Sequence, residues 1–239
     1  MTVLHRYPPL IQGTLVKRYK RFFADVALED GSVVTAHCPN TGPMTGVSTP
    51  GSLVALSRST NPARKLAFTW EMIQAEEVWI GINTSLPNRI VQQGLLQHAF
   101  PELETYTAVQ PEVNYGTEKS RIDFLLTGGE KSTYVEVKNT TWTCLLSEGR
   151  QALFPDCVTT RGQKHLRELT RIAESGDRAA VIFFVNRSDC RSFSPGDEAD
   201  PLYGQLLRHA VSQGMIALPY RFETTLETVR LIGIASLAL

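Results

Sequence analysis

Residues 121–139 read R-I-D-F-L-L-T-G-G-E-K-S-T-Y-V-E-V-K-N, and this stretch decides the fold of the chain around it. It holds two apolar runs of strand length on either side of Gly128-Gly129, a pattern that predicts a β-hairpin. Asp123 lies in the first run, and Glu136 and Lys138 lie two residues apart in the second. Residues two apart in a strand point to one face, so Glu136 and Lys138 share a face.

A hairpin centred between Gly129 and Glu130 places Asp123 opposite Glu136. Directly opposed side chains have Cβ atoms about 4.5–5.5 Å apart, and like charges at that spacing destabilise the pair unless something compensates. A divalent cation compensates, and Mg²⁺ is commonly held by one or two carboxylates together with water and phosphate. We therefore expect Asp123 and Glu136 to be ligands of Mg²⁺ (or Mn²⁺). Lys138 is then placed to orient an attacking water or to stabilise charge on a phosphate.

The alternative is a solvated strand face on which Asp123, Glu136 and Lys138 form only a cross-strand salt bridge. Against it, Phe124, Leu125 and Leu126 and the two valines beside Glu136 make both strands apolar enough to be buried. Buried charges are paired or bind metal. This favours a catalytic site at these three residues.

Composition predicts a soluble globular protein. The chain has 239 residues, 42% hydrophobic and 20% charged, which suffices for one large domain or two modest ones. It has no run of about 18 apolar residues and its start lacks an export signal, so we expect a cytoplasmic protein with no membrane partner. The four cysteines show no metal-ligand spacing, which argues against both zinc and disulfides.

Charge is distributed unevenly although the formal net charge is zero. Residues 1–65 carry eight Lys and Arg against three Asp and Glu, so the rest of the chain carries 16 against 21. The N-terminal part is therefore positive, as a groove that follows a nucleic-acid backbone requires.

The N-terminal part is predicted to be a small barrel. Short strand patterns broken by turn residues recur between residues 10 and 83, without a helical period, and this is typical of an OB-type barrel. Such barrels bind single strands through basic and aromatic side chains. The expected DNA-binding residues are Lys17, Arg18, Tyr19, Lys20 and Arg21, extended by Arg58, Arg64 and Lys65. The alternative is that the aromatic residues pack the barrel and the basic ones only solvate a turn.

The C-terminal part is predicted to begin with a helix over residues 85–100, so that 1–82 form one domain and 83–239 the other. A strand over 109–115, the hairpin and a long loop over 140–157 follow. Thr160 and Gln163 have the spacing of a capping box at a helix start. Gln163 and Lys164 then lie in the first turn, where phosphate contact is the functional interpretation and a solvated helix end the alternative.

Later segments are predicted as a buried strand over 179–185 and a helix followed by a strand over 215–222. A helix-turn-helix over 206–220 is the alternative, but Pro219 would fall inside its second helix.

The arrangement of Asp123 with Glu136-Val137-Lys138 resembles the PD-(D/E)XK nuclease superfamily. Further motifs resemble the family of sugar fermentation stimulation protein A over nearly the whole length. They are R-Y-K-R-F at 18–22, H-C-P-N-T-G at 37–42, N-R-I at 88–90, S-R-I-D-F at 120–124 and R-G-Q-K-H-L-R-E-L at 161–169. The chain departs from the nuclease pattern at Ile122, where proline is usual.

The resemblance implies an α+β protein with an N-terminal OB-type barrel, a restriction-endonuclease-like C-terminal domain and binding to DNA, single- or double-stranded. It makes Asn88 and Arg89 candidates for the rim of the site, and implies the Val137 carbonyl as a further metal ligand. The expected function is sequence-nonspecific DNA binding with Mg²⁺-dependent phosphodiester hydrolysis. The alternative is a non-catalytic DNA-binding regulator of sugar (maltose) metabolism genes, because a fold does not establish an activity.

Overall fold

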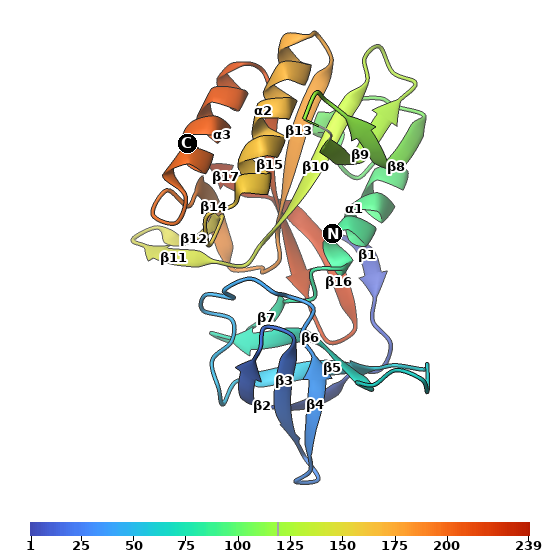
Figure 1. Ribbon diagram of the computed structural model, residues 1–239, viewed down its shortest axis with the longest axis vertical. Coiled ribbons are helices and arrows are strands. Elements are labelled where there is room, and N and C mark those ends of the chain that lie inside the picture. Colours follow the sequence, from blue (N-terminus) through green and yellow to red (C-terminus); the bar gives the residue numbers. More distant parts are fainter. Residues whose placement is uncertain (119) are drawn as a thin grey trace.

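The structure, a computed structural model, describes residues 1–118 and 120–239 and consists of a β-barrel next to a larger α/β part (Figure 1). Its helices are α1 (Leu86–Leu96), the 3₁₀ helix η1 (Pro101–Leu103), α2 (Thr160–Glu174) and α3 (Pro201–Ser212). Its strands up to the hairpin are β1 (Thr2–Arg6), β2 (Ile11–Tyr19), β3 (Phe23–Leu28), β4 (Val33–His37), β5 (Leu53–Arg58), β6 (Phe68–Ala75), β7 (Val78–Gly81), β8 (Ala108–Tyr115), β9 (Ser120–Thr127) and β10 (Thr133–Thr140). The later strands are β11 (Thr143–Leu146), β12 (Gly149–Phe154), β13 (Arg178–Val185), β14 (Cys190–Pro195), β15 (Ile216–Thr224), β16 (Thr228–Ile234) and β17 (Ser236–Leu237).

The barrel closes through five strands, which confirms the OB-type prediction. β2 pairs with β3 and β5, β3 with β4, and β5 with β6, all antiparallel, while β4 pairs with β6 in parallel and completes the circle. Alternate residues such as Leu15, Val26, Val54 and Trp70 point inward and form the barrel core. The β2–β3 turn lies at the end of the barrel nearest the α/β part, and the β3–β4 turn lies at the far end (Figure 1).

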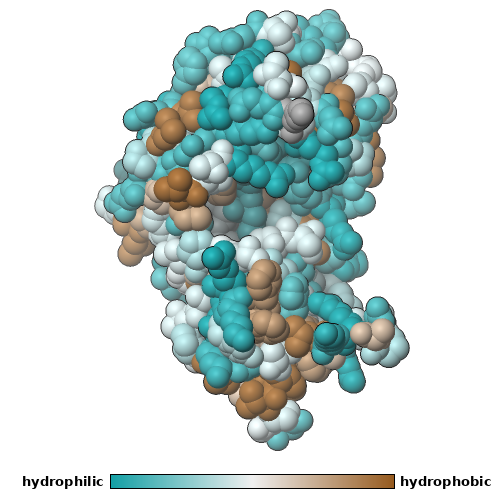
Figure 2. Space-filling view, viewed as in Figure 1, coloured by the Kyte–Doolittle hydropathy of each residue, from teal (hydrophilic) through white to brown (hydrophobic). Residues whose placement is uncertain are grey.

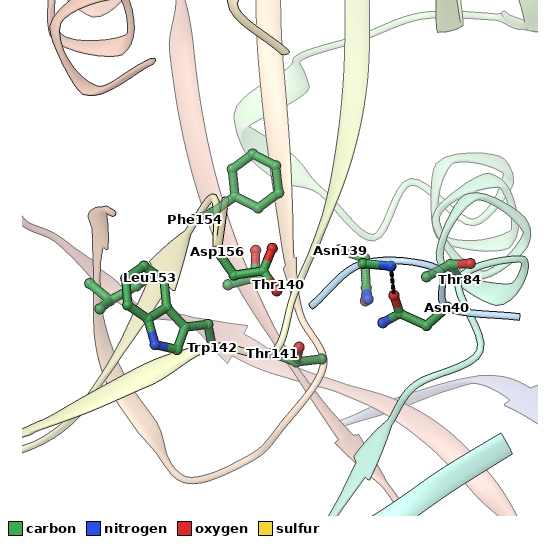
Figure 3. A pocket seen from close by; sticks show the side chains of 10 residues that line it. Asn40, Thr84, Asn139, Thr140, Thr141, Trp142, Leu153, Phe154 and Asp156 are labelled. Carbon is green, nitrogen blue, oxygen red and sulfur yellow. Dashed lines mark hydrogen bonds between the residues drawn. The ribbon is translucent and has the colours of Figure 1, made fainter. Parts of the chain in front are cut away.

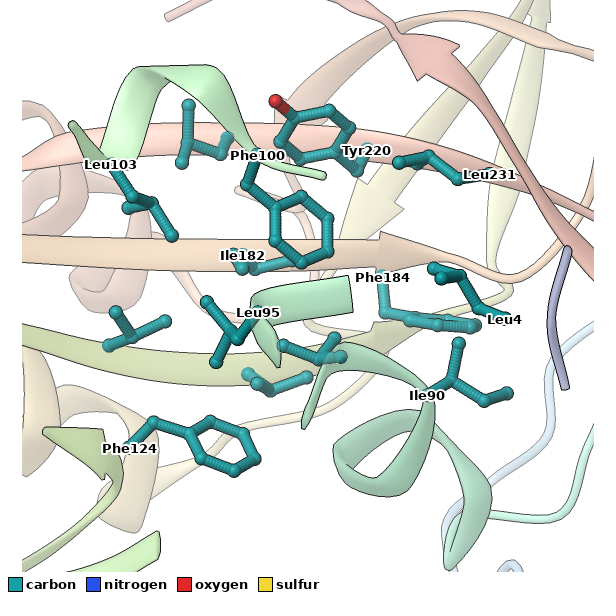
Figure 4. Packing of buried hydrophobic residues seen from close by; sticks show 14 of the residues in the cluster. Leu4, Ile90, Leu95, Phe100, Leu103, Phe124, Ile182, Phe184, Tyr220 and Leu231 are labelled. Carbon is teal, nitrogen blue, oxygen red and sulfur yellow. The ribbon is translucent and has the colours of Figure 1, made fainter. Parts of the chain in front are cut away.

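The α/β part is built on a mixed sheet in the order β15-β13-β10-β9-β8. β10 and β15 flank β13 in parallel, and β9 and β8 continue antiparallel. α1 covers one face, where Ile90 and Leu95 pack with Ile182 and Phe184 (Figure 4). α2 and α3 cover the other face, where their apolar side chains pack with β13. This three-layer arrangement confirms the predicted α/β C-terminal domain.

Two connections tie the barrel to the sheet. β1, at the start of the chain, pairs with β16 rather than with any barrel strand, and β16 pairs with β15. β7 pairs with β6 of the barrel and, at Trp79, with β15. The division into residues 1–82 and 83–239 stays a prediction.

Several predicted elements are confirmed, since α1, β8, the hairpin, α2, β13 and the α3–β15 pair follow the expected order. The loop predicted over residues 140–157 is wrong, because it contains the hairpin β11–β12. These strands join β14 and β17 in a second, four-stranded sheet. Their short sequences lack a clear alternation, and the pairing of β12 with β14 joins them to the rest of this sheet. Across the described residues, no helix combines the length and apolar character needed to cross a membrane.

Candidate active site

Asp123 lies where β9 and β10 stop pairing. Their ladder ends at Phe124–Val135, in the register that the hairpin pattern predicts, one step short of an Asp123–Glu136 pair. There the backbone N–H of Val137 donates to Asp123 Oδ2 at 2.8 Å. Asn88 of α1 donates from Nδ2 to Asp123 Oδ1, also at 2.8 Å. Both carboxylate oxygens are therefore held in place from two elements, and Asn88 belongs to the site.

Glu136 lies in the middle of the sheet and is 2% exposed. Its strand is paired with β13 along its whole length, with Glu136 opposite Val181. Lys138 Nζ donates to Glu136 Oε1 at 2.6 Å, and His165 Nδ1 of α2 contacts the same oxygen. Glu136 Oε2 is buried and has no hydrogen-bond partner among the described residues. One carboxylate oxygen is thus fixed by two side chains, and the other has no such contact with any described residue.

The two carboxylates experience different electrostatic surroundings. Burial, and then the charge of Glu136, raise the pKa of Asp123 to about 6 against the smaller opposing effects of Val137 N–H, Lys138 and Asn88. Burial also acts to raise the pKa of Glu136, but Lys138 and His165 together outweigh it, so the pKa of Glu136 is lowered. Glu136 is therefore ionised at neutral pH. Of the two carboxyl groups, Asp123 loses its proton at the higher pH.

His165 is the functional neighbour that sequence reasoning missed, because a lone histidine is more often a surface residue. It is 4% exposed and points from α2 onto Glu136, 29 residues away in the chain. A signal exists in the sequence, since His165 and Leu169 are four residues apart and lie on one face of a helix. The buried face of α2 therefore includes His165.

The residues present fit a divalent cation. No group of three or more His, Cys, Asp or Glu side chains within residues 1–118 and 120–239 is arranged as a metal cage. Two carboxylates that approach one buried region, one with an unpaired oxygen, match the smaller protein ligand set that Mg²⁺ uses with water and phosphate. Asp123 and Glu136 are the side chains that would hold it.

The predicted DNA-binding residues of the barrel fall into two groups. Lys17, Lys20 and Arg21 are exposed at or beside the β2–β3 turn. Tyr19 stacks on Phe23 with 5.4 Å between ring centroids, and Lys17 Nζ lies 5.3 Å from the Tyr19 ring. Arg18 differs, because its Nη2 donates to the backbone carbonyls of Arg21, Asn40 and Gly42. Its guanidinium therefore holds a loop of the barrel.

The second group, Arg58, Arg64 and Lys65, is exposed on the β5–β6 hairpin. This hairpin projects sideways from the barrel (Figure 1). The structure therefore separates these residues from the β2–β3 turn instead of joining them into one patch.

The start of α2 differs from the prediction. Its N-cap is Thr159, whose hydroxyl accepts from Gly162 N at 3.1 Å, and not Thr160, so the capping-box prediction is wrong. Gln163 is buried, and its Nε2 donates at 2.9 Å to both carboxylate oxygens of Asp200. Lys164 is half-buried and donates from Nζ to the Glu118 carbonyl. The Gln163 amide is thus occupied within the protein.

Hydrophilic side chains gather over the α/β part on the face shown in Figure 2, above a hollow between that part and the barrel. Both parts of the chain match models of known protein families. Residues 16–82 match the family model "SfsA N-terminal OB domain", and residues 85–228 match "Sugar fermentation stimulation protein RE domain".

Two curated relatives and a solved structure each cover at least 99% of the chain. A sugar fermentation stimulation protein homolog of Gloeobacter violaceus is 60% identical over 239 residues, covering 100% of both chains. A homolog of the same name from a Cyanothece species is 58% identical and covers 99% of this chain and 98% of its own. The structure described as Pyrococcus furiosus SfsA in complex with Ca²⁺ has a TM-score of 0.85 at 26% identity and covers 100% of both chains.

Proposed function

The chain belongs to the sugar fermentation stimulation protein family, and from this premise and the site geometry we propose that it is a DNA-binding protein that hydrolyses phosphodiester bonds with the help of a divalent metal, Mg²⁺ or Mn²⁺. One observation carries the proposal. Glu136 is almost fully buried beside Asp123 and Lys138, yet its Oε2 has no hydrogen-bond partner among the described residues. Lys138 and His165 balance the charge through Oε1, but a buried oxygen without a partner is costly, so a ligand at Oε2 would stabilise the carboxylate.

A divalent cation is the ligand that suits this position. The solved relative is described as a complex with Ca²⁺, so a protein of the same fold binds a divalent ion. Bound by Asp123 and Glu136, such a cation would polarise the phosphate and make a bound water more acidic.

The protein's own residues supply the other requirements of hydrolysis. Lys138 Nζ is fixed by Glu136, and the Lys138 side chain is 14% exposed, so in this proposal its charge acts on a phosphate at the surface of the site. His165 and Lys138 keep Glu136 ionised, and Asn88 orients Asp123. In the reaction, a P–O bond to the water oxygen forms, the P–O bond to a sugar oxygen breaks, and the proton of the water passes to the departing oxygen.

In this proposal the β2–β3 turn binds the DNA strand. Lys20 and Arg21 have φ angles of 47° and 63°, which cost energy for residues other than glycine. The strained turn presents two basic side chains next to the stacked Tyr19–Phe23 pair. In this proposal the basic side chains contact the DNA phosphates and the aromatic pair contacts a base.

Lys138→Ala tests the proposal, with Lys131→Ala as its matched control because Lys131 is an exposed lysine of the same hairpin. We expect the parent and both variants to melt at higher temperature with millimolar Mg²⁺ or Mn²⁺. Cleavage of single- or double-stranded DNA should fall about 100-fold or more in Lys138→Ala, which is typical of losing one electrostatic contact to the transition state. Lys131→Ala should cleave like the parent.

The result that contradicts the proposal is a parent protein with no metal-dependent melting shift and no cleavage under any divalent ion. The non-catalytic DNA-binding regulator is then the remaining interpretation of the fold. Normal cleavage by Lys138→Ala would leave a nuclease but remove Lys138 from its mechanism.

A further inference from the structure

A cavity of about 100 Å³ lies between the barrel and the end of β10 (Figure 3). Barrel and α/β residues both line it: Asn40, Gly42, Thr84, Asn139, Thr140, Thr141, Trp142, Leu153, Phe154 and Asp156. In Figure 3, Trp142, Leu153 and Phe154 stand on one side and Asn40, Thr84 and Asn139 on the other. The cavity is therefore a junction site that neither part forms alone.

The cavity is adjacent to the carboxylate site along β10. Glu136, Lys138 and Thr140 alternate with Val137 and Asn139, so the first three share one face of the strand. At a rise of about 3.3 Å per residue, Thr140 lies only about 7 Å beyond Lys138. A ligand that occupies the cavity is thus close to a phosphate held at Lys138.

The lining combines aromatic surface with free amide donors. Trp142 and Phe154 contribute the two aromatic rings. Asn40 Oδ1 accepts from Gly42 N at 2.9 Å, and Asn139 Oδ1 accepts from Asn186 Nδ2 at 3.1 Å. Neither Nδ2 group of Asn40 or Asn139 donates a hydrogen bond to any residue that the structure describes. Such walls suit a flat group with hydrogen-bonding edges.

Charge excludes phosphate as the occupant. Asp156 is the one ionisable side chain in the lining, and a carboxylate repels a phosphate while it accepts from an amino group. Size excludes a large occupant, because even a fully enclosed cavity of about 150 Å³ binds no more than a single ring such as benzene. This cavity is partly open and about 100 Å³ in volume, so it suits one aromatic ring with polar edges.

We propose that this cavity is a subsite for one base of a single-stranded nucleic acid, bound against Trp142 with its edge toward Asn40 and Asn139. The proposal rests on the proposed function, and it adds the substrate class. A base enters such a cavity only when it is unstacked and unpaired, so single strands and open ends are the substrates and an intact duplex is not.

The barrel contributes to the subsite through Arg18. Its Nη2 donates at 2.9 Å to the carbonyls of both Asn40 and Gly42, and so fixes the loop that forms one wall. The basic segment of the barrel therefore shapes the subsite with Arg18 while Lys17, Lys20 and Arg21 stay exposed for the phosphates.

The test is an abasic scan of a single-stranded DNA oligonucleotide, with affinity measured by fluorescence anisotropy in EDTA so that the probe is not cleaved. For the parent, one position should show a loss of affinity of about 5- to 150-fold when its base is removed, the range for one base–aromatic stack. Trp142→Leu should bind the intact and the abasic probe equally. Trp79→Leu is the matched control, because Trp79 is half-buried on β7 and is not in the lining.

Each outcome decides the matter. If the parent binds and cleaves DNA but no position shows an abasic penalty, the subsite proposal is wrong and the proposed function stands. The same holds if the penalty is unchanged in Trp142→Leu. If no oligonucleotide binds at all, both proposals are wrong. Should Trp142→Leu melt at much lower temperature than the parent, Asn40→Ala replaces it, with a smaller but position-specific reduction of the penalty expected.

Discussion

Asp123 and Glu136 approach one buried region, but their neighbours give them different tasks. Glu136 receives two cationic or proton-donating side chains on one oxygen, which keeps it ionised. Asp123 receives only neutral donors directly and its pKa is raised to about 6. The electrostatic repulsion between the two carboxylates is therefore smallest when Asp123 is protonated or when a cation binds between them.

Asp123→Asn should keep or raise the melting temperature of the metal-free protein and abolish the stabilisation by Mg²⁺ or Mn²⁺. Removing the charge relieves on the order of 3 kcal/mol, from a pKa raised by about two units. The new amide nitrogen, however, faces a hydrogen-bond donor, either Asn88 Nδ2 or Val137 N–H. An unpaired amide group there destabilises the fold by about 1–3 kcal/mol. The amide of Asn88 can turn its oxygen toward it, so the net effect is zero to favourable. Melting curves with and without metal provide the measurement.

The pH dependence gives this substitution an internal control. Because the pKa of Asp123 is raised above its ordinary value of 3.8, the folded parent binds more protons than the unfolded chain between about pH 4 and 6. The parent therefore loses stability relative to Asp123→Asn as pH rises through this window, and the difference is constant above it. A difference that shrinks with rising pH would show that Asp123 is not the titrating group.

At the scale of residues, the sequence predicts what lies within one hairpin. The Asp, Glu and Lys positions follow from strand alternation and from the turn, whose Gly128 has a φ of 87° that favours glycine. Asn88, His165 and Asp200 could not be assigned in this way, because their partners lie 29 to 37 residues away and only packing brings them together.

At the scale of elements, the junction of α2 and α3 is organised by Asp200, which caps α3 by accepting from Tyr203 N at 3.0 Å. The same carboxylate accepts from Thr159 N, just before α2, and from the Gln163 side chain. Burial acts to raise the pKa of Asp200, but these hydrogen bonds outweigh it, so the pKa is lowered. The start of α2 is therefore attached to α3 and is not simply an open helix end.

Gln163→Ala should consequently lower the free energy of unfolding by about 1–3 kcal/mol, the cost of losing a buried hydrogen bond to a charged group. Lys164→Ala serves as the control, because it removes a cation at the same helix start without touching Asp200. We expect Lys164→Ala to melt near the parent and to bind DNA more weakly if its ammonium contacts phosphate. Urea denaturation and DNA titration of both variants provide the measurements. Normal stability of Gln163→Ala with weakened DNA binding would restore Gln163 as a phosphate contact.

Local patterns predict elements well where a long period or a strong turn exists, as in α2, β13 and the central hairpin. They place the N-cap of α2 one residue late, because Thr159 and Thr160 are adjacent and both suit the position. They miss β11 and β12, because the pairing of β12 with β14 is a long-range contact that no local pattern encodes.

At the scale of the whole molecule, the barrel and the sheet are connected at both ends of the chain. The pairing of β1 with β16 brings Thr2 next to Leu231, and no sequence pattern indicates such a contact. On the other side, Arg150 and Arg187 of the α/β part both pair with Glu76 in the β6–β7 turn. The barrel is therefore held against the sheet, with its β2–β3 turn on the side that faces the α/β part (Figure 1).

This orientation places the two groups of basic residues of the barrel at different positions relative to the α/β part. The β2–β3 turn, which carries Lys20 and Arg21 and follows Lys17 of β2, lies at the barrel end nearest the α/β part (Figure 1). The β5–β6 hairpin, which carries Arg58, Arg64 and Lys65, projects sideways. A single strand whose phosphate reaches Lys138 should therefore pass the first group. Arg18 is excluded from this comparison because its replacement would release the Asn40–Gly42 loop.

Replacing Lys17, Lys20 and Arg21 together with glutamine should weaken binding of all single-stranded sequences similarly and flatten the salt dependence. Each lost phosphate contact lowers the slope of log affinity against log salt by about 0.7 for single strands, so the triple variant should lose up to about 2. Glutamine keeps most of each aliphatic stem, and surface ion pairs such as Lys17–Asp25 contribute little, so the melting temperature should hold. The matched control replaces Arg58, Arg64 and Lys65 with glutamine, which removes the same charge from the side hairpin and should leave the slope near that of the parent. A contrary result is a reduced salt slope in the control and an unchanged slope in the first variant. The DNA strand would then cross the β5–β6 hairpin, and the proposed path from the β2–β3 turn to Lys138 would be wrong.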